Sequence, residues 1–470
     1  MVDPRRSGGG PDAGRLDLSR PRLIHIVGVG GAAMSAIASV LSSMGHGVTG
    51  SDLKASPGLE RLRAMGVTVS VGHQAGQVGE AEALAVSTAV PASNPEVVRA
   101  RELGLPVLSR AEILSAIAAT RRTVAVAGTH GKTTTSSMLA LVAVEGGLRP
   151  SFVIGGDLNE IGTGAAWDEG EWLVAEADES DGTFLELRPE VAVVTSIEPD
   201  HLEHYGSYEA LTGAFGRFLS AVPGARIVSA DFPVAAGLAA GCGAVTYGTS
   251  PGADYRITRV RSARSRVSFS LEHAGEDLGP IEVPVPGLHN ARNAAAAVVA
   301  GLALGVDLDA ARRALARFAG VARRFQFRGE RDGVTYVDDY AHLPGEVAPV
   351  LAAAAAGGWG RVVCVFQPHR YSRTAALWAS FADAFAGADL LAVTDVYPAG
   401  EEPRPGVSGQ LVADAVAGAH PDQAVVYLPD RVQLREWLER SLRPGDLCLT
   451  LGAGDLTSLA GQLLDTEGGG

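Results

Sequence analysis

The chain has 470 residues, of which 46% are hydrophobic and 20% charged, and its formal net charge is −14. This length predicts two to three domains with ample cores, and the composition excludes a disordered protein. The negative charge argues against non-specific nucleic-acid binding, because no basic surplus is available to neutralise phosphates. The longest apolar stretch, residues 294–306, is too short to span a bilayer and predicts a core helix.

Residues 1–19 and the cysteines favour a cytoplasmic protein. The first 19 residues are rich in Gly, Arg, Asp and Pro, which predicts a disordered tail, and no apolar segment follows that would make it a secretion signal. Cys242, Cys364 and Cys448 lie far apart, without the spacing of a metal site. We therefore expect buried, reduced thiols.

The first ordered segment begins with a strand at residues 23–27, followed by a G-x-G-x-x-A turn and a helix to about Met44. A second strand then ends at Asp52, so that an acidic residue follows the turn by roughly 20 positions, as in the Rossmann fingerprint. NAD is the commonest ligand of such a turn, but any nucleotide diphosphate offers similar chemistry to the helix N-terminus. The candidate binding residues are Gly28, Gly30, Gly31, Ala32, Ala33 and Asp52.

A second glycine-bearing turn lies between the apolar strand 123–127 and an apolar helix over 136–142. Backbone N–H groups at such a turn bind anions, a lysine reaches the outer phosphates, and the threonine after it binds magnesium in P-loops. Val126 stands where the usual pattern has its first glycine, so this loop is a shortened variant. The pattern alone is also compatible with an ordinary turn. However, the chain has only two lysines among its 39 basic residues, and a retained lysine argues for a role that arginine cannot fill. We interpret Gly128, Thr129, His130, Gly131, Lys132, Thr133 and Thr134 as a nucleotide-phosphate site.

Two further predicted strands end in acidic residues. Residues 172–175 run into the cluster 176–181, and residues 191–197 run into Glu198-Pro199-Asp200-His201. Strands that alternate with helices predict a parallel sheet, whose ligands gather at the carboxyl ends of the strands. Either acidic cluster alone is compatible with solvated surface. Their joint placement beside the phosphate loop favours a Mg²⁺ site, to which His201 would add a nitrogen ligand.

The last third of the chain repeats the pattern of a strand followed by polar residues. Predicted strands cover 335–337, 362–366, 390–393 and 447–451, which indicates another α/β sheet. The sequence thus predicts an α/β protein with domains at 20–120, 121–322 and 323–470 after the tail.

Together these motifs resemble the Mur ligases over nearly the whole chain after Pro21. The matching segments are residues 24–32, 127–135, 176–181 (E-A-D-E-S-D), 197–202 (I-E-P-D-H-L), 287–293, 323–326 (R-R-F-Q), 366–374 and 452–455. Single motifs are shared among relatives, but the set is highly specific. The chain departs from the family in having one histidine, His342, where two usually precede Pro344, and Ala33 where glycine is usual. It has no lysine after Leu202, where several later-acting members carry a carbamylated lysine, so the alanine-adding branch is the most similar.

The resemblance implies a Rossmann-like UDP-binding domain, a central P-loop ATPase-like domain with a mostly parallel sheet, and a C-terminal Rossmann-like α/β domain. It also implies an ATP- and Mg²⁺-dependent ligase of peptidoglycan precursor synthesis. This ligase would join L-alanine to the lactyl carboxylate of UDP-N-acetylmuramate through an acyl phosphate. The catalytic residues implied are Lys132, Glu176, His201 and His342.

The binding residues follow from the same resemblance. Lys132 would hold the outer phosphates, with Thr133 and Glu176 on one Mg²⁺ and with Glu176 and His201 on a second. Asn290 and Asn293, near His289, are candidates for adenine, although a helix N-cap is the alternative. Arg324 would contact phosphates when the third domain closes. His342, Arg370 and Arg373 are candidates for the alanine carboxylate, with surface ion pairs as the alternative for the arginines. The UDP moiety would contact the first glycine turn, Asp52 and His73.

Three other functions would explain part of these motifs. A ligase that attaches a ready-made tripeptide to the same UDP-sugar in cell-wall recycling shares most of these motifs. An NAD-dependent oxidoreductase explains the first turn but leaves Lys132, Glu176 and His201 without a purpose. An inactive nucleotide-binding regulator would be expected to lack at least one of those three residues. We expect a monomer or homodimer with small-molecule substrates, no nucleic acid and no membrane partner.

Overall fold

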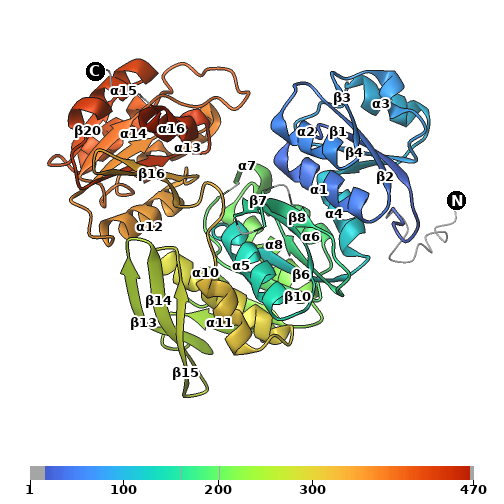
Figure 1. Ribbon diagram of the computed structural model, residues 1–470, viewed down its shortest axis with the longest axis horizontal. Helices are drawn as coiled ribbons and strands as arrows, with labels where there is room; N and C mark the ends of the chain where they lie inside the picture. The colour runs from blue at the N-terminus through green and yellow to red at the C-terminus, as the bar shows by residue number, and fades with distance from the viewer. Residues whose placement is uncertain (1–15, 160, 181, 201, 466–470) are drawn as a thin grey trace, which may run out of the picture.

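The structure, a computed structural model, describes residues 16–159, 161–180, 182–200 and 202–465. Three sheets follow one another along the chain, and each belongs to its own domain with helices packed on it (Figure 1). The predicted α/β class with three domains is therefore confirmed. The residues at which one domain was predicted to pass into the next stay predictions.

The first domain has a five-stranded, wholly parallel sheet in the order β3-β2-β1-β4-β5, which is the Rossmann order 3-2-1-4-5-6 without its sixth strand. Its strands are β1 (Leu23–Val27), β2 (Gly47–Asp52), β3 (Thr68–Val71), β4 (Ala83–Val86) and β5 (Val107–Ser109). Its helices are α1 (Ala32–Ser43), α2 (Pro57–Ala64), α3 (Pro95–Glu102) and α4 (Arg110–Ala118), with a 3₁₀ turn, η1, at Ala75–Val78. Within the predicted tail, residues 16–19 are described and Leu18 is buried, whereas residues 1–15 lie outside the described residues.

The central domain has a ten-stranded sheet in the order β15-β14-β13-β12-β11-β10-β6-β9-β7-β8. The strands from β12 to β7 in this order pair in parallel, and antiparallel pairs occur only toward the two edges, so the sheet is mostly parallel as predicted. The strands are β6 (Arg122–Ala127), β7 (Ser151–Leu158), β8 (Thr163–Ala166), β9 (Trp172–Glu176), β10 (Val191–Val194), β11 (Arg226–Ser229), β12 (Val245–Gly248), β13 (Tyr255–Ala263), β14 (Arg266–His273) and β15 (Glu276–Val283).

Two buried helices, α5 and α10, pack against each other beside this sheet. Helix α10 contains most of the predicted core helix, and its apolar side chains between Ala291 and Ala300 are buried on every side, as expected of a helix inside a domain. The helices of the domain are α5 (Lys132–Glu145), α6 (Thr183–Glu186), α7 (Leu202–Tyr205), α8 (Tyr208–Ala221), α9 (Pro233–Cys242), α10 (Leu288–Ala303) and α11 (Leu308–Ala316).

The third domain has a six-stranded sheet in the order β16-β17-β21-β18-β19-β20, parallel except for the edge pair β16–β17. The strands are β16 (Gln326–Arg331), β17 (Val334–Asp339), β18 (Arg361–Phe366), β19 (Leu390–Val393), β20 (Ala424–Tyr427) and β21 (Asp446–Leu451). The helices are α12 (Pro344–Ala355), α13 (Tyr371–Leu377), α14 (Gln410–Ala419), α15 (Arg431–Ser441) and α16 (Ser458–Leu464), with 3₁₀ turns η2 (Trp378–Phe381) and η3 (Asp455–Thr457).

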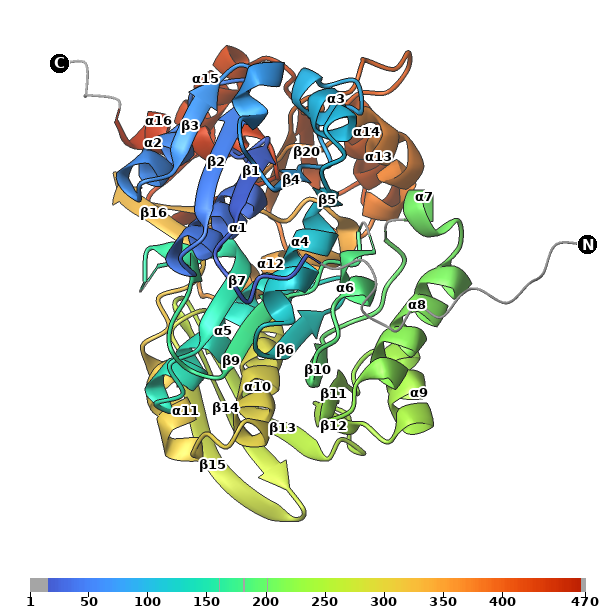
Figure 2. The ribbon, with the colours of Figure 1, turned by 90° about the vertical axis from the view of Figure 1, so that its right-hand side faces the viewer.

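The first and third domains lie on the same side of the central domain, which is the lower part of the molecule in Figures 1 and 2. Helix α1 packs on β7 and β8, and Met34 and Ile37 of that helix share a hydrophobic cluster with Val153 and Ala165 of these strands. The contact fixes the first glycine turn relative to the central sheet. In the part of the chain that the structure describes, no helix combines the length and the apolar character needed to cross a membrane.

Candidate active site

The phosphate loop connects the carboxyl end of β6 to the first residue of α5. Strand β6 lies between β10 and β9 in the sheet, so the loops after all three strands meet at one edge. Thr129 N–H donates to the Ser196 carbonyl over 3.0 Å, and His130 N–H donates to the Ser196 hydroxyl over 3.0 Å. Gly131 has φ of 82°, and a Cβ there would lie 2.5 Å from Asn293 Oδ1. The loop is therefore held from two sides, and glycine is required where it touches α10.

Lys132 is buried at the start of α5, with its side chain 13% exposed. Its Nζ lies 2.9 and 2.8 Å from the two carboxylate oxygens of Glu179, and it donates to the Gly128 carbonyl over 2.8 Å. Burial by itself lowers the pKa of this ammonium, but Glu179 and the neighbouring Asp178 raise the pKa above its usual value. The lysine is thus a permanent cation beside the loop that was predicted to bind phosphate.

Glu176 ends β9 and lies against the residue that follows this lysine. Thr133 Oγ1 donates to Glu176 Oε1 over 3.0 Å, and Gly155 N–H donates to Oε2 over 2.7 Å. A hydroxyl and a carboxylate in contact suit Mg²⁺, which prefers oxygen and keeps much of its coordination for water and phosphate. The third predicted ligand, His201, lies outside the described residues. Among the described residues no group of three or more His, Cys, Asp or Glu side chains is arranged to hold a metal ion.

A second, smaller cavity of about 220 Å³ lies on the other side of the phosphate loop. Asn290 and Asn293 line it together with His289, and Asn293 Nδ2 donates to Asn290 Oδ1 over 3.4 Å. Burial lowers the pKa of His289 to about 4, so this imidazole is neutral at physiological pH. Apolar side chains complete the walls, which include Phe232, Val285 and Phe318. An apolar slot with a few amide groups suits a planar base such as adenine.

In the first domain, only some of the residues predicted to bind UDP line a cavity, and others make contacts within the protein. Asp52 Oδ2 accepts the N–H of Gly30 over 2.8 Å, so this carboxylate fixes the glycine turn. His73 Nδ1 lies 2.9 Å from the hydroxyl of Ser51. Gly30, Ala32 and Ala33 line the large cavity described below, whereas Gly28, Gly31, Asp52 and His73 do not.

The third domain contributes two arginines and a histidine. His342 Nδ1 lies 3.1 Å from the Tyr340 carbonyl, and its ring centroid is 5.5 Å from that of His369. Arg370 has φ of 70°, outside the usual range for a residue with a side chain. Arg373 Nη1 lies 3.5 Å from His369 Nδ1. Among the described residues neither arginine has a carboxylate within ion-pair distance, which leaves both charges available to an anion.

Arg324 lies in the segment that joins the second domain to the third. Its Nη1 is 3.8 Å from Glu346 Oε1, and its guanidinium lies over the ring of Tyr340. Burial alone lowers the pKa of Arg324, but Glu346 and Asp339 raise it above its usual value. The side chain faces both cavities.

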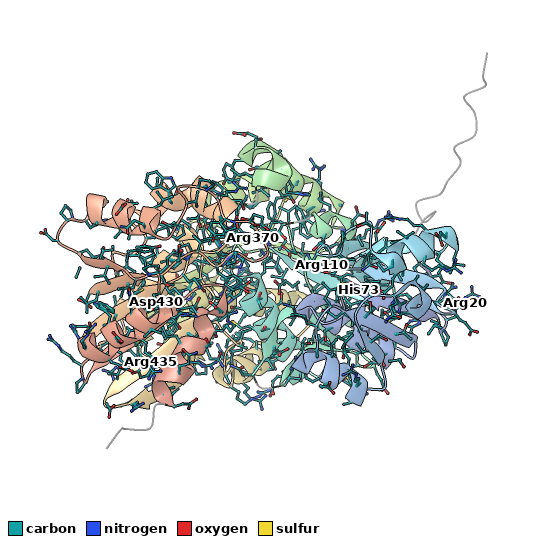
Figure 3. The ribbon with its side chains drawn as sticks, turned by 90° about the horizontal axis from the view of Figure 1, so that it is seen from above. Arg20, His73, Arg110, Arg370, Asp430 and Arg435 are labelled. Atoms are coloured by element: carbon teal, nitrogen blue, oxygen red, sulfur yellow. The ribbon has the colours of Figure 1, made fainter. Side chains whose placement is uncertain are left out.

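A cavity of about 1110 Å³ is lined by residues from all three domains. It is lined by the first glycine turn, by Lys132, Thr133 and Glu176, and by His342, Arg370 and Arg373. Arg110 and Arg370 lie toward the middle of the molecule where the domains meet, whereas His73 lies over the first domain (Figure 3). Such a cavity can hold a nucleotide-linked substrate, a phosphate donor and a small carboxylate at the same time.

Sequence reasoning assigned no role to three charged residues, of which Arg110 and Glu346 line this cavity and Glu179 lies buried behind Lys132. Arg110, at the start of α4, donates to Asp178 Oδ2 over 3.0 Å and lines the cavity across the boundary between the first two domains. Glu179 is the carboxylate paired with Lys132, and Glu346 lines the third-domain side. Glu179 belongs to a motif that the sequence analysis quoted. Arg110 and Glu346 have no local signal for a place at the cavity, because Asp178 and His130, which they face, are distant in the chain.

Comparison with family models gives three consecutive matches. The model of the Mur ligase family, catalytic domain, matches residues 23–122, and the model of the Mur ligase middle domain matches residues 126–301. The model of the Mur ligase, glutamate ligase domain, matches residues 323–454.

The chain is also similar to curated proteins over nearly its full length. It is 47% identical over 451 residues to the UDP-N-acetylmuramate–L-alanine ligase of Rubrobacter xylanophilus, covering 94% of this chain and 99% of the relative. It is 44% identical over 452 residues to the ligase of the same name from Pelotomaculum thermopropionicum, covering 95% and 98%. Among solved structures, the UDP-N-acetylmuramate-alanine ligase of Thermotoga maritima superposes with a TM-score of 0.80 at 29% identity, covering 94% of this chain and 98% of that one.

Proposed function

The chain belongs to the Mur ligase family, and on this premise we propose that it joins the amine of L-alanine to the lactyl carboxylate of UDP-N-acetylmuramate at the expense of ATP. The observation that carries the proposal is the shared cavity. Its walls include residues of all three domains, namely Gly30, Ala32 and Ala33 of the first glycine turn, Lys132 and Thr133 at the phosphate loop, and Arg370 and Arg373 of the third domain. A cavity lined by three domains suits a reaction with three substrates, which closure of the domains brings together.

The chemistry explains why the site needs a phosphate donor. A carboxylate is a poor electrophile at neutral pH, so its oxygen first takes the γ-phosphoryl group of ATP, and ADP leaves. The alanine amine then attacks the carbonyl carbon of the acyl phosphate, loses a proton, and the tetrahedral intermediate expels inorganic phosphate. Transfer between anions depends above all on charge neutralisation and alignment. Lys132 is placed to supply a fixed positive charge at the outer phosphates.

Metal binding fits the same edge of the sheet. Thr133 and Glu176, whose oxygens are in contact, would hold Mg²⁺ together with His201. When bound, Mg²⁺ supplies further positive charge to the phosphates of ATP and to the substrate carboxylate. Glu176 is also fixed by the N–H of Gly155, so its orientation does not depend on the metal.

The remaining residues bind the ends of the substrates. Asn290 and Asn293 would bind the adenine of ATP, and the amide groups and apolar walls of the smaller cavity support this assignment. The guanidinium groups of Arg370 and Arg373 suit the carboxylate of L-alanine, because a guanidinium offers paired donors to a carboxylate. The turn at residues 28–33 presents the start of α1 to the diphosphate of the UDP-sugar.

Phosphate release by the purified chain tests this function. UDP-N-acetylmuramate, ATP and Mg²⁺ would be incubated with L-alanine, with the tripeptide of cell-wall recycling, or with no acceptor, and the ligated product weighed by mass spectrometry. We expect phosphate release and a product only with L-alanine. Release with the tripeptide alone would instead assign the chain to recycling, and no release with either acceptor would contradict a ligase function.

A further inference from the structure

One carboxylate of the third domain, Glu346, lies where the phosphate loop meets the amino-acid side of the cavity. It is in the first turn of α12, and its side chain is only 12% exposed. Its Oε2 accepts the backbone N–H groups of His342 and Leu343 over 3.0 and 3.3 Å, and lies 3.2 Å from His342 Nδ1. One oxygen therefore fixes both the backbone and the ring of His342.

The other oxygen faces the central domain. Oε1 lies 3.8 Å from Nδ1 of His130, in the phosphate loop, and 3.8 Å from Nη1 of Arg324. His130 Nδ1 is buried and has no hydrogen-bond partner among the described residues. A Cβ on Gly345, the residue before Glu346, would lie 2.9 Å from His130 Nε2, so the start of α12 is packed directly against the loop.

The contacts of His342 determine which ring nitrogen carries the proton. Nδ1 has two oxygen acceptors within 3.2 Å, the Tyr340 carbonyl and Glu346 Oε2. A neutral imidazole has one N–H, and two acceptors at Nδ1 place it there. Nε2 then keeps a lone pair, and His342 lines the cavity, as Arg373 does. A lone pair at this point can accept a hydrogen bond from the amine of the incoming amino acid.

We propose that Glu346 is a positioning residue that fixes the Nδ1–H tautomer of His342 and ties the amino-acid site to the phosphate loop through His130. This rests on the proposed ligase function, because it assigns His342 Nε2 to the acceptor amine. Charge supports the assignment. Burial alone raises the pKa of Glu346, but the N–H of the His342 ring and the charge of Arg324 hold this pKa well below its usual value, so the carboxylate is ionised.

A helix cap is the simpler explanation of this carboxylate, and the chain contains a matched control for it. Glu112 occupies the same position in the first turn of α4, where it accepts the backbone N–H of Ser109 over 2.7 Å. Its side chain is exposed, and it does not line the cavity. Glu346→Gln and Glu112→Gln both keep a carbonyl oxygen for capping, and both remove the negative charge.

The test compares the two variants in the phosphate-release assay with saturating UDP-N-acetylmuramate. For Glu346→Gln we expect kcat/KM for L-alanine to fall by about 10- to 100-fold, while KM for ATP changes less than about threefold. Glu346→Asp, which keeps the charge, should recover part of the loss. Glu112→Gln should match the unmodified chain. If Glu346→Gln behaves like Glu112→Gln, or if both lose activity in proportion to a lower melting temperature, the positioning role is refuted.

A spectroscopic measurement makes the result independent of turnover. The ¹⁵N shifts of the His342 ring, assigned by comparison with His342→Gln, report which nitrogen is protonated. We expect Nδ1–H in the unmodified chain and loss of that preference in Glu346→Gln. An Nε2–H tautomer in the unmodified chain would overturn the proposal. If the unmodified chain releases no phosphate with L-alanine, the ligase function fails, whereas the tautomer still tests the contact between Glu346 and His342.

Discussion

Replacing Lys132 with methionine tests two expected roles of this lysine, as a cation at the outer phosphates of ATP and as the ion-pair partner of Glu179. The side chain of Glu179 is fully buried, and its oxygens lie 2.9 and 2.8 Å from Lys132 Nζ. Methionine has a similar length but no charge. We expect Lys132→Met to lower turnover by orders of magnitude, because the fixed cation at the outer phosphates is gone. We also expect it to remove the ammonium that faces the buried carboxylate of Glu179.

The loss of stability from breaking the Lys132–Glu179 ion pair can be estimated. Removing one partner of a buried ion pair costs about 3–5 kcal/mol, because the remaining charge is uncompensated. At the lower limit this corresponds to a fall of roughly 6–12 °C in the melting temperature of a domain of about 200 residues. Burial already raises the pKa of Glu179 above its usual value, and losing Lys132 raises it further. A carboxyl group whose pKa is higher in the folded than in the unfolded chain binds its proton preferentially in the folded state. The loss of melting temperature in Lys132→Met should therefore become smaller as the pH falls toward the pKa of Glu179 in the folded chain.

The double variant Lys132→Met/Glu179→Gln distinguishes stability from catalysis. It also removes the negative charge that faced Lys132, so it should regain most of the melting temperature lost in Lys132→Met at pH 8 while remaining inactive in the phosphate-release assay. Lys54→Met, which removes the only other lysine from an exposed position, should leave the melting temperature unchanged. Activity restored by the double variant, or near-normal ligation by Lys132→Met, would refute the role at the phosphates.

Three further predictions concern the amino acid, the metal and the pH. Arg373→Ala should raise KM for L-alanine by one to two decades (roughly 1.5–3 kcal/mol) and leave KM for ATP nearly unchanged. Arg373→Lys should recover only part of the lost L-alanine affinity, because lysine lacks the paired donors of a guanidinium. If Arg373→Ala instead weakens ATP binding, this arginine belongs to the nucleotide site. His201→Ala should raise the Mg²⁺ concentration needed for half-maximal phosphate release, and an unchanged Mg²⁺ dependence would make this histidine structural. Burial and the charge of Lys132 lower the pKa of His130, but the carboxylates of Glu346 and Glu198 outweigh them and raise this pKa above 6.5. The charged imidazole therefore stabilises the folded chain below about pH 6.5. This stabilisation is lost as the pH rises through the pKa that His130 has in the folded chain. The melting temperature should therefore fall between pH 6 and 9 more steeply in the unmodified chain than in His130→Gln, and equal slopes would contradict this.

Features that depend on neighbouring residues could be predicted from the sequence. The strand 123–127 and its glycine turn form because apolar β-branched residues lead into residues that permit a positive φ, and β6 covers Arg122–Ala127. Similarly, β1 covers the predicted residues 23–27. The meander β13–β15 was not predicted. Its strand β13 carries several charged or polar side chains, which give no buried run or clean alternation to recognise.

Features that depend on distant residues could not be predicted in this way. The acidic residue of the Rossmann fingerprint, Asp52, lies against its own glycine turn, and no sequence pattern shows whether such a carboxylate faces a ligand or the backbone. Glu346 resembles an ordinary first-turn glutamate because its partners, His130 and Arg324, belong to other parts of the chain. Contacts across domain boundaries depend on the packing of whole domains, which local propensities do not encode.

The segment that enters the third domain determines how these distant groups meet. Arg323 and Phe325 have φ of 62° and 44°, a conformation that costs a residue with a side chain about 1–3 kcal/mol. Contacts on both sides offset this cost, since Arg323 Nη2 donates to the Gly452 carbonyl over 2.7 Å and Phe325 N–H donates to Asp339 Oδ2 over 2.7 Å. Arg324, between them, is thereby turned toward the cavities. The backbone strain is thus stored where the chain passes from the ATP side to the amino-acid side, and the contacts that hold it come from the third domain. A movement of that domain would therefore also move Arg324, and we expect this arginine to reach the phosphates of ATP when the domains close.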